Sequence, residues 1–295
     1  MQASRRLKMG ALSLVLALPL ALPVRAQTPP PEPPDPTPDP TYGNLFYGSV
    51  PPNGATAPVL VFIPGLFGSA SSWWGVGNND MYAYAYQAGY RTAFISPNRL
   101  NLPSTGGIEP DGKVIESVFP ALLKHYQVTQ VYMISHSKGG LDLQYALANA
   151  KFRGYAKAVF TLASPNQGDA LADWCYSTFS SVCSTAGLLI PAIHDMQTSI
   201  VSKYRSQWDP LFQSSGIPFY TVAGNTFTGN TLTDITGPII LLVTGFQTND
   251  GILTLAESVL PSNYAVQLAV LNNNHFDVPQ GHNSWPIMAP LLSAP

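Results

Sequence analysis

Charged side chains are scarce in this chain: its 14 Lys and Arg and 16 Asp and Glu residues make up only 10% of 295 residues. An average soluble domain carries about 25%. The formal net charge is -2, and basic residues cluster only at the N-terminus. Nucleic-acid binding needs concentrated Lys and Arg to displace counterions, so the composition excludes that class of partner. Apolar residues make up 45% of the chain, which excludes a disordered regulator and favours a neutral or apolar partner.

Long hydrophobic runs are also missing. Residues 9–22 form an apolar run that Pro19 interrupts, and its 14 residues fall short of the about 20 that span a bilayer. Three basic residues precede it, and small residues follow at the -3 and -1 positions of a cleavage site after Ala26. We therefore predict no transmembrane segment, a signal peptide over residues 1–26, and secretion to the periplasm or the medium. The cleaved chain would have a net charge of -6.

Proline is concentrated just after this segment. Residues 28–41 hold eight prolines and three acidic residues, a composition that removes backbone donors and cannot build a core. We interpret residues 27–41 as a semi-rigid acidic linker. A ligand for a proline-binding module is the alternative. The catalytic domain is then expected over residues 42–295.

In that domain, short apolar runs alternate with longer segments compatible with helices. Strands are expected at 59–63, 92–96, 130–135, 156–162, 218–223 and 264–271, and helices near 79–89, 113–126, 139–150 and 284–293. This alternation predicts an α/β fold, with a mostly parallel central sheet and helices on both faces. The ligand of such a sheet lies beyond the carboxyl ends of its strands.

One of these strand ends carries the clearest catalytic motif. The residues Ser135-His-Ser-Lys-Gly-Gly140 lie between an expected strand and an expected helix. This arrangement would expose the hydroxyl of Ser137 on a tight turn, with small residues two positions before and after it. The usual first residue is Gly, and Ser135 keeps the requirement for a small side chain. The alternative is a serine in an ordinary strand-to-helix turn.

Several motifs together resemble the secreted true lipases of bacteria, which have the α/β-hydrolase fold. The motifs are Ile63-Pro-Gly-Leu-Phe-Gly68, the segment around Ser137, Leu162-Ala-Ser-Pro-Asn-Gln-Gly168, Asn249-Asp-Gly251 and Asn274-His-Phe-Asp277. The resemblance extends from about residue 58 to 290. Pro64 stands where the family usually has His, and Asn166 where it usually has His or a similar residue. It implies a serine carboxylic-ester hydrolase with a cap over the site.

A serine nucleophile needs a general base, and the base needs a carboxylate that fixes its tautomer. In this fold the order along the chain is Ser, acid, His. His275 follows a late strand and matches the family's His-x-Asp element, whereas His282 is the alternative base. Asp250 matches the family's Asn-Asp-Gly motif, although Asp-Gly is also a common turn signal. Asp234 is the alternative acid.

The oxyanion formed during ester attack needs preformed backbone donors. We expect these to be the N–H groups of Lys138, directly after the nucleophile, and of Leu66 in the Pro-Gly-Leu-Phe-Gly loop. Gly65 and Gly68 would let this loop turn its amides inward.

Residues 169–215 break the alternation of strands and helices and are rich in large apolar side chains. An insertion here would form a cap that lines an acyl pocket, and the alternative is ordinary packing of extra helices onto the body. Cys175 and Cys183 are the only cysteines, and in an exported chain they are expected to form a disulfide.

Metal chemistry has little support. The position of Asp277 binds a structural calcium in the family that the chain resembles, but Ca²⁺ takes six to eight oxygens and we identify no second aspartate. We expect no required cofactor. A metal hydrolase using His275, Asp277 and His282 would leave Ser137 unexplained.

These observations predict a secreted carboxylic-ester hydrolase, of which a triacylglycerol lipase is the favoured form. The expected partner is an apolar ester at a lipid or polymer interface. An extracellular polyester depolymerase and a short-chain esterase are the alternatives within the class. A non-catalytic binding module on the same fold is the alternative outside it.

Overall fold

The computed structural model describes residues 30–293, except 53, 76–77 and 99–100. The predicted signal peptide lies outside the described residues. Within the described residues, no helix combines the length and the apolar character needed to cross a membrane.

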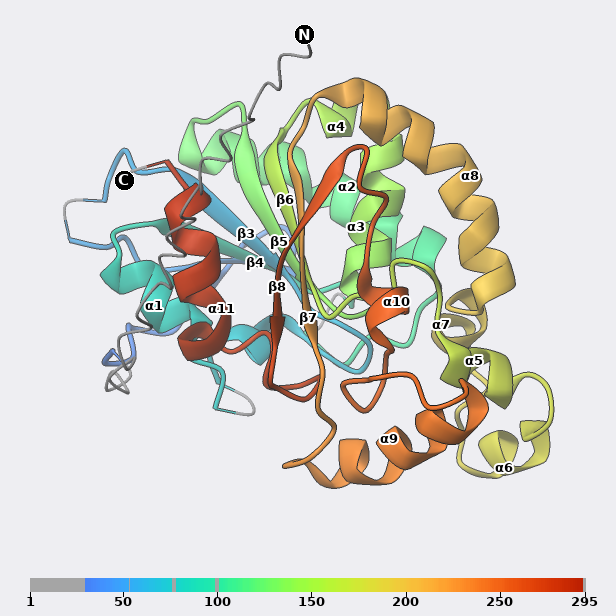
Figure 1. Cartoon of the computed structure of the whole chain (residues 1–295). Coiled ribbons are helices and arrows are strands. Elements are labelled where there is room, and N and C mark those ends of the chain that lie inside the picture. Colours follow the sequence, from blue (N-terminus) through green and yellow to red (C-terminus); the bar gives the residue numbers. More distant parts are fainter. Residues whose placement is uncertain (1–29, 53, 76–77, 99–100, 294–295) are drawn as a thin grey trace, which may run out of the picture.

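The centre of the molecule is an eight-stranded sheet with the order β1-β2-β4-β3-β5-β6-β7-β8 (Figure 1). Its strands are β1 Thr37–Pro38, β2 Leu45–Tyr47, β3 Val59–Ile63, β4 Arg91–Ile95, β5 Val131–His136, β6 Ala156–Leu162, β7 Phe219–Gly224 and β8 Ala265–Leu271. β3 to β8 are parallel, while β1 and β2 pair antiparallel at one edge. The predicted α/β-hydrolase architecture is confirmed, and each of the six predicted strands agrees with an observed one to within one residue.

Helices cover both faces of the sheet, as predicted (Figure 1). They are α1 Met81–Gln87, α2 Ile108–Tyr126, α3 Gly139–Ala148, α4 Ala150–Arg153, α5 Ala170–Cys175, α6 Ser180–Thr185, α7 Pro191–Asp195, α8 Thr198–Ser215, α9 Thr231–Val243, α10 Leu255–Ser258 and α11 Gly281–Met288, with 3-10 turns at Ala70–Trp73 and Ala289–Leu291. α1 and α11 pack together on one face, and α2, α3 and α8 lie on the other.

The strands are apolar on both sides because both faces of the sheet are covered. In β3, Val59, Val61 and Ile63 belong to the core under α2, α3 and α8, and Leu60 and Phe62 belong to the core under α1 and α11. This alternation follows from the two-residue period of a strand.

The end of the predicted linker is part of the folded domain, so the spacer interpretation is wrong for this stretch. Pro33 and Pro36 are buried, and the Tyr82 hydroxyl donates a hydrogen bond to the Pro34 carbonyl at 3.1 Å. Thr37–Pro38 forms β1 at the edge of the sheet. Proline is tolerated there because an edge strand leaves part of its backbone unpaired.

The predicted cap also has different boundaries. α8 packs on the body, where Trp208 and Phe212 are buried in the core, so ordinary packing describes this helix. α5, α6 and α7 lie beyond the carboxyl edge of the sheet, and α5 contacts α9, a helix that the sequence did not predict (Figure 1). The expected disulfide between Cys175 and Cys183 joins α5 to α6.

Candidate active site

Ser137 lies on a sharp turn between β5 and α3. Its backbone φ is 52°, in the left-handed region that non-glycine residues seldom adopt. Neighbouring segments approach the turn closely: a Cβ added at Gly139 would lie 2.2 Å from the Pro64 carbonyl oxygen, and one at Gly140 would lie 2.3 Å from Ser164 Oγ. At the position where the motif usually has Gly, the Ser135 hydroxyl is buried and donates to the Phe160 carbonyl at 3.2 Å. That hydrogen bond explains why a serine is accommodated there.

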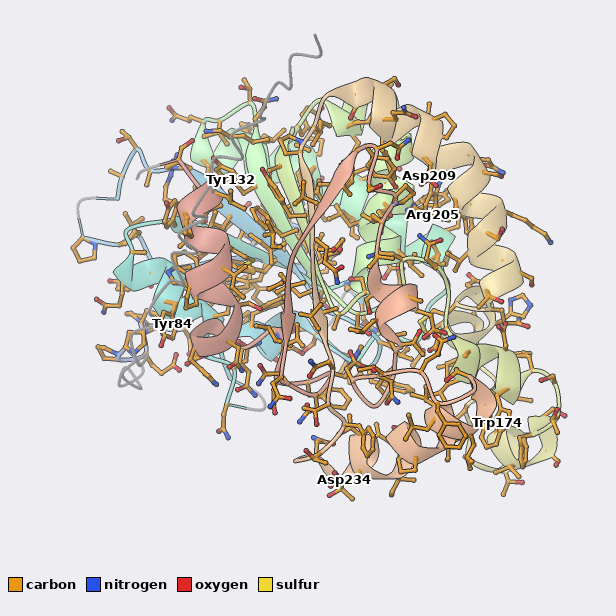
Figure 2. All side chains as sticks on the ribbon, in the orientation of Figure 1. Tyr84, Tyr132, Trp174, Arg205, Asp209 and Asp234 are labelled. Atoms are coloured by element: carbon orange, nitrogen blue, oxygen red, sulfur yellow. A yellow bond between two sulfur atoms is a disulfide. The ribbon has the colours of Figure 1, made fainter. Side chains whose placement is uncertain are left out.

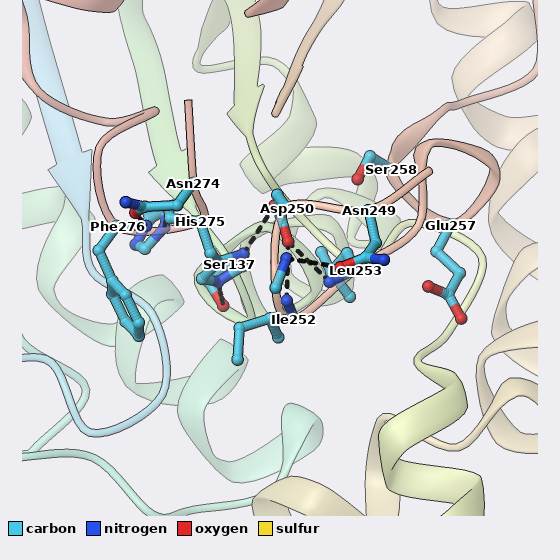
Figure 3. Close-up of polar contacts among 12 residues, drawn as sticks. Ser137, Asn249, Asp250, Ile252, Leu253, Glu257, Ser258, Asn274, His275 and Phe276 are labelled. Carbon is cyan, nitrogen blue, oxygen red and sulfur yellow. Dashed lines mark hydrogen bonds and ion pairs between the residues drawn. The ribbon is translucent and has the colours of Figure 1, made fainter. Parts of the chain in front are cut away.

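Three side chains converge at this turn (Figure 3). His275 Nε2 lies 2.9 Å from Ser137 Oγ, and His275 Nδ1 lies 2.9 Å from Asp250 Oδ2. The other oxygen of Asp250 accepts the Ile252 and Leu253 amides at 2.9 and 2.7 Å. The His275 backbone N–H donates to the Asp250 carbonyl at 2.9 Å, which ties the two loops together. All three side chains are at least nine-tenths buried.

The alternative residues lie elsewhere. His282 begins α11, where its Nδ1 is 2.9 Å from Asp80 Oδ2 and its side chain is 43% exposed. Asp234 lies on α9, and it accepts the Gly229 amide at 3.2 Å (Figure 2). Of the two bases and two acids considered from the sequence, the structure brings only His275 and Asp250 to Ser137.

The surroundings of Asp277 do not favour a calcium site. Its two carboxylate oxygens accept side-chain amide hydrogen bonds from Asn274 and Gln280, at 2.7 and 2.9 Å. In the part of the chain that the structure describes, no three His, Cys, Asp or Glu side chains are grouped as metal ligands. Among the described residues, the side chains around Asp277 therefore do not form the group of acidic ligands that a Ca²⁺ site would use, and no step below depends on a metal.

The two expected oxyanion donors lie beside the nucleophile. The loop after β3 passes so near Ser137 that a Cβ at Gly65 would lie 2.6 Å from the Ser137 Cβ. Phe67 adopts φ 57° and donates its amide to the Ser104 carbonyl at 2.9 Å. Among the described residues, the Leu66 and Lys138 amides donate to no other protein group. Both donors remain available for a ligand oxygen.

His136 contacts the base loop, a role that sequence reasoning missed. Its Nε2 lies 3.0 Å from the His275 carbonyl oxygen, to which it donates a hydrogen bond. Burial lowers the pKa of His136, and electrostatic repulsion by the neighbouring His275 lowers it further, to about 3. The ring therefore stays neutral. The strand that carries the nucleophile is thereby linked to the loop that carries His275.

Lys138 carries a second feature that the sequence did not indicate. Its side chain is only 1% exposed, and its ammonium lies 2.9 Å from Asp111 of α2 and 2.7 Å from Asp142 of α3. Burial disfavours the ammonium, but the two carboxylates outweigh this and raise the pKa of Lys138. Burial also raises the pKa of Asp142, to about 8. Lys138 and Asp142 are only four residues apart, but no local pattern could have predicted the contact with Asp111, which lies 27 residues before Lys138.

A second pair of buried carboxyls lies close to the site. Asp169 accepts the Leu171 amide at 2.8 Å, and Glu257 accepts the Ala170 and Thr254 amides at 2.7 and 2.6 Å. Burial, together with the negative charge of Glu257, raises the pKa of Asp169 well above its usual range. Burial likewise raises the pKa of Glu257.

Ser137 and His275 open onto a cavity of about 620 Å³. Its walls come from the loop after β3, from α5, α6 and α7, and from α9, and they are mainly apolar. They include Leu171, Leu188, Ile193, Met196, Ile239 and Leu253. Cavities of this size and character hold apolar ligands.

The chain resembles a solved lipase over most of its length. It is 30% identical to the mature form of the lipase BlEst2 from Bacillus licheniformis, with a TM-score of 0.72, and the match covers 85% of this chain and 99% of that one. The propeptide form of the same lipase matches with 30% identity and a TM-score of 0.74, covering 85% of this chain and 53% of that one. No protein-family model and no curated protein matches the sequence.

Fold and comparison together define the class: the chain belongs to the lipases and esterases of the α/β-hydrolase fold, which are carboxylic-ester hydrolases. Within that class, the chain is similar to BlEst2 over nearly the whole length of that lipase's mature form.

Proposed function

We propose that the protein is a serine carboxylic-ester hydrolase in which Ser137 is the nucleophile, His275 the general base and Asp250 the residue that orients the base. The observation that carries this proposal is the pair of 2.9 Å contacts in series, from Asp250 through His275 to a serine on a left-handed turn. This is the geometry that activates a hydroxyl whose free pKa makes it a weak nucleophile.

The reaction follows from these positions. His275 Nε2 takes the proton of Ser137 Oγ as the oxygen attacks the ester carbonyl. The carbonyl oxygen becomes an oxyanion, which accepts hydrogen bonds from the Leu66 and Lys138 amides. The imidazolium then gives its proton to the departing alcohol, and an acyl-enzyme remains. A water molecule, activated by His275 in the same way, releases the acid and restores Ser137.

Asp250 supports both steps. Because two backbone amides already hold one of its oxygens, the other is fixed towards His275 Nδ1. A carboxylate held in this way keeps the imidazole in the tautomer whose Nε2 accepts a proton, and it stabilises the imidazolium.

The favoured substrate is a triacylglycerol with apolar acyl chains, which the mainly apolar cavity supports. We further propose export, supported by the signal-peptide pattern over residues 1–26 and by the disulfide between Cys175 and Cys183.

The test compares wild type and Ser137→Ala on tributyrin, on triolein and on a polyester film. We expect hydrolysis of both glycerides by wild type and loss of at least about 10⁴-fold in the variant, as for removal of a serine nucleophile elsewhere. Activity on the film alone would identify a polyester depolymerase, and activity on tributyrin alone a short-chain esterase. Full activity of Ser137→Ala would refute the mechanism, and a folded wild type inert towards every ester would favour a binding module.

A further inference from the structure

The oxyanion loop and the nucleophile turn are joined by a buried polar chain. It begins at Lys138, whose own backbone amide is one of the two proposed oxyanion donors. The Lys138 ammonium contacts Asp111 Oδ2 at 2.9 Å, and the same carboxylate oxygen accepts the Ser104 hydroxyl at 2.6 Å. Each of these three residues is more than nine-tenths buried.

Ser104 continues the chain to the loop that carries the second donor. Its carbonyl accepts the Phe67 amide at 2.9 Å, and its own amide donates to the Gly68 carbonyl at 3.1 Å. These two bonds hold the turn just after Leu66. A continuous set of polar contacts therefore connects the side chain of Lys138 to the backbone around Leu66.

Stability alone gives a poor reason for such a cluster. Burying an ammonium and carboxylates costs solvation energy that their attraction seldom exceeds, and apolar residues of similar volume often stabilise a core better. The cluster also lies beside the proposed oxyanion hole. The position of a donor is critical there, because the donor contributes only if it is close to the atom on which negative charge develops.

We propose that Lys138, Asp111 and Ser104 are positioning residues. They fix the position of the Leu66 amide relative to the Lys138 amide, and so set the geometry of the oxyanion hole. This inference rests on the proposed function. None of the three side chains needs to touch the substrate, because they act through the two backbone donors.

The sharpest test is Ser104→Ala, because replacing Lys138 would leave two buried carboxylates uncompensated and endanger folding. The Ala variant keeps both ion pairs and removes only the hydroxyl that links Asp111 to the oxyanion loop. Ser215→Ala is the matched control: its hydroxyl donates to the Phe212 carbonyl at 2.7 Å and accepts the Ile217 amide at 3.2 Å, at the end of α8 that precedes β7 and away from the oxyanion loop. Each variant is measured for kcat and KM on tributyrin and for inhibition by butylboronic acid, whose tetrahedral adduct with serine resembles the oxyanion intermediate.

For Ser104→Ala we expect kcat to fall about 10-fold or more, KM to change less than about twofold, and the affinity for butylboronic acid to fall by the same factor as kcat/KM. Ser215→Ala should stay within about twofold of wild type in all three values. Wild-type kcat and boronate affinity in folded Ser104→Ala would overturn the inference. So would a fall in kcat with unchanged boronate affinity, since the loss would then lie outside the oxyanion hole.

The wild-type arm separates this inference from the proposed function. If wild type hydrolyses tributyrin and Ser104→Ala equals it, only the positioning role fails. If folded wild type neither hydrolyses esters nor binds butylboronic acid, the proposed function fails, and the inference that rests on it is overturned as well.

Discussion

At the scale of single residues, Ser137, His275 and Asp250 occupy positions that backbone contacts fix independently of their side chains. The Ser137 amide donates to the Leu162 carbonyl at 3.0 Å, and the His275 amide donates to the Asp250 carbonyl at 2.9 Å. Replacing one catalytic side chain should therefore remove chemistry while leaving the fold in place.

The choice between the two histidines gives the first prediction. His275→Ala should lower kcat/KM for tributyrin by at least about 10⁴-fold, because Ser137 loses its base. His282→Ala is the matched control and should stay within about threefold, since His282 lies on α11 and pairs with Asp80, just before α1, instead. Steady-state kinetics of the two purified variants checks this, and an active His275→Ala protein would show that the base was misassigned.

His136 gives the second prediction. His136→Leu leaves the His275 carbonyl without its donor, which should destabilise the fold by about 1–3 kcal/mol. It should also lower kcat, because the base loop loses a tie to the nucleophile strand. His136→Gln can place an amide N–H near the same point and should retain most of both properties. Urea unfolding and tributyrin kinetics measure the two effects, and identical behaviour of Leu and Gln variants would contradict the role.

The site was predictable from the sequence only where a local motif marked it. Ser137 is marked by the turn between strand and helix, and Asp250 and His275 by the family motifs around them. His136 and Lys138 lie within the same serine motif, but each has a partner distant in the sequence: His136 contacts His275, and Lys138 contacts Asp111 as well as the nearby Asp142. Contacts between distant segments leave no periodicity or spacing that a single sequence could reveal.

At the scale of elements, the buried parallel strands were predictable because both of their faces are apolar and their β-branched residues cluster. β2 is only three residues long, and β1 has two residues, one of them a proline, so neither produces such a pattern. α9 contains Gly237 and Pro238, which are poor helix formers.

The carboxyl pair between α5 and α10 gives a pH prediction. At low pH Asp169 is protonated in both the folded and the unfolded states. As the pH rises, the unfolded state ionises first, because burial and Glu257 raise the pKa of Asp169 in the folded state. Stability that is present at low pH is therefore lost as the pH rises through the folded-state pKa.

Asp169→Asn removes this loss and can still accept the Leu171 amide. We expect the melting temperature of the variant to exceed that of wild type at pH 8, by about 2–4 °C for each kcal/mol gained in the free energy of unfolding. At pH 5 the difference should be smaller. Asp35→Asn, at an exposed carboxylate, should show no such trend. Thermal melts at both pH values test this, and a difference independent of pH would contradict it.

At the scale of the whole molecule, the shortage of charge is matched by apolar side chains exposed near the cavity. Leu232 and Val182 line it and are 49% and 57% exposed, and on α9 Leu242 is 72% exposed. In Figure 2, Trp174 and Asp234 lie on this side of the molecule, at the bottom of the view. The composition had indicated an apolar partner, and the structure places part of the exposed apolar surface at this cavity, where we propose that the ester binds.

The cavity predicts how acyl length is selected. Ala186 is an exposed residue on the cavity wall, so Ala186→Trp fills space there without disturbing the core. We expect kcat/KM for a long-chain p-nitrophenyl ester to fall about 10-fold, while that for the butyrate changes little. Ala150→Trp, exposed on α4 and absent from the cavity wall, is the control. Equal losses on both chain lengths would show that the cavity does not hold the acyl chain.

The central claim is that Ser137 is an activated nucleophile, and covalent labelling tests it most directly. Folded protein is treated with a fluorophosphonate, digested, and mapped by mass spectrometry. We predict a single adduct on Ser137, with ester hydrolysis lost in step with labelling and no labelling in His275→Ala on the same timescale. A folded protein that forms no adduct at Ser137, or that hydrolyses esters undiminished once labelled there, would contradict the mechanism.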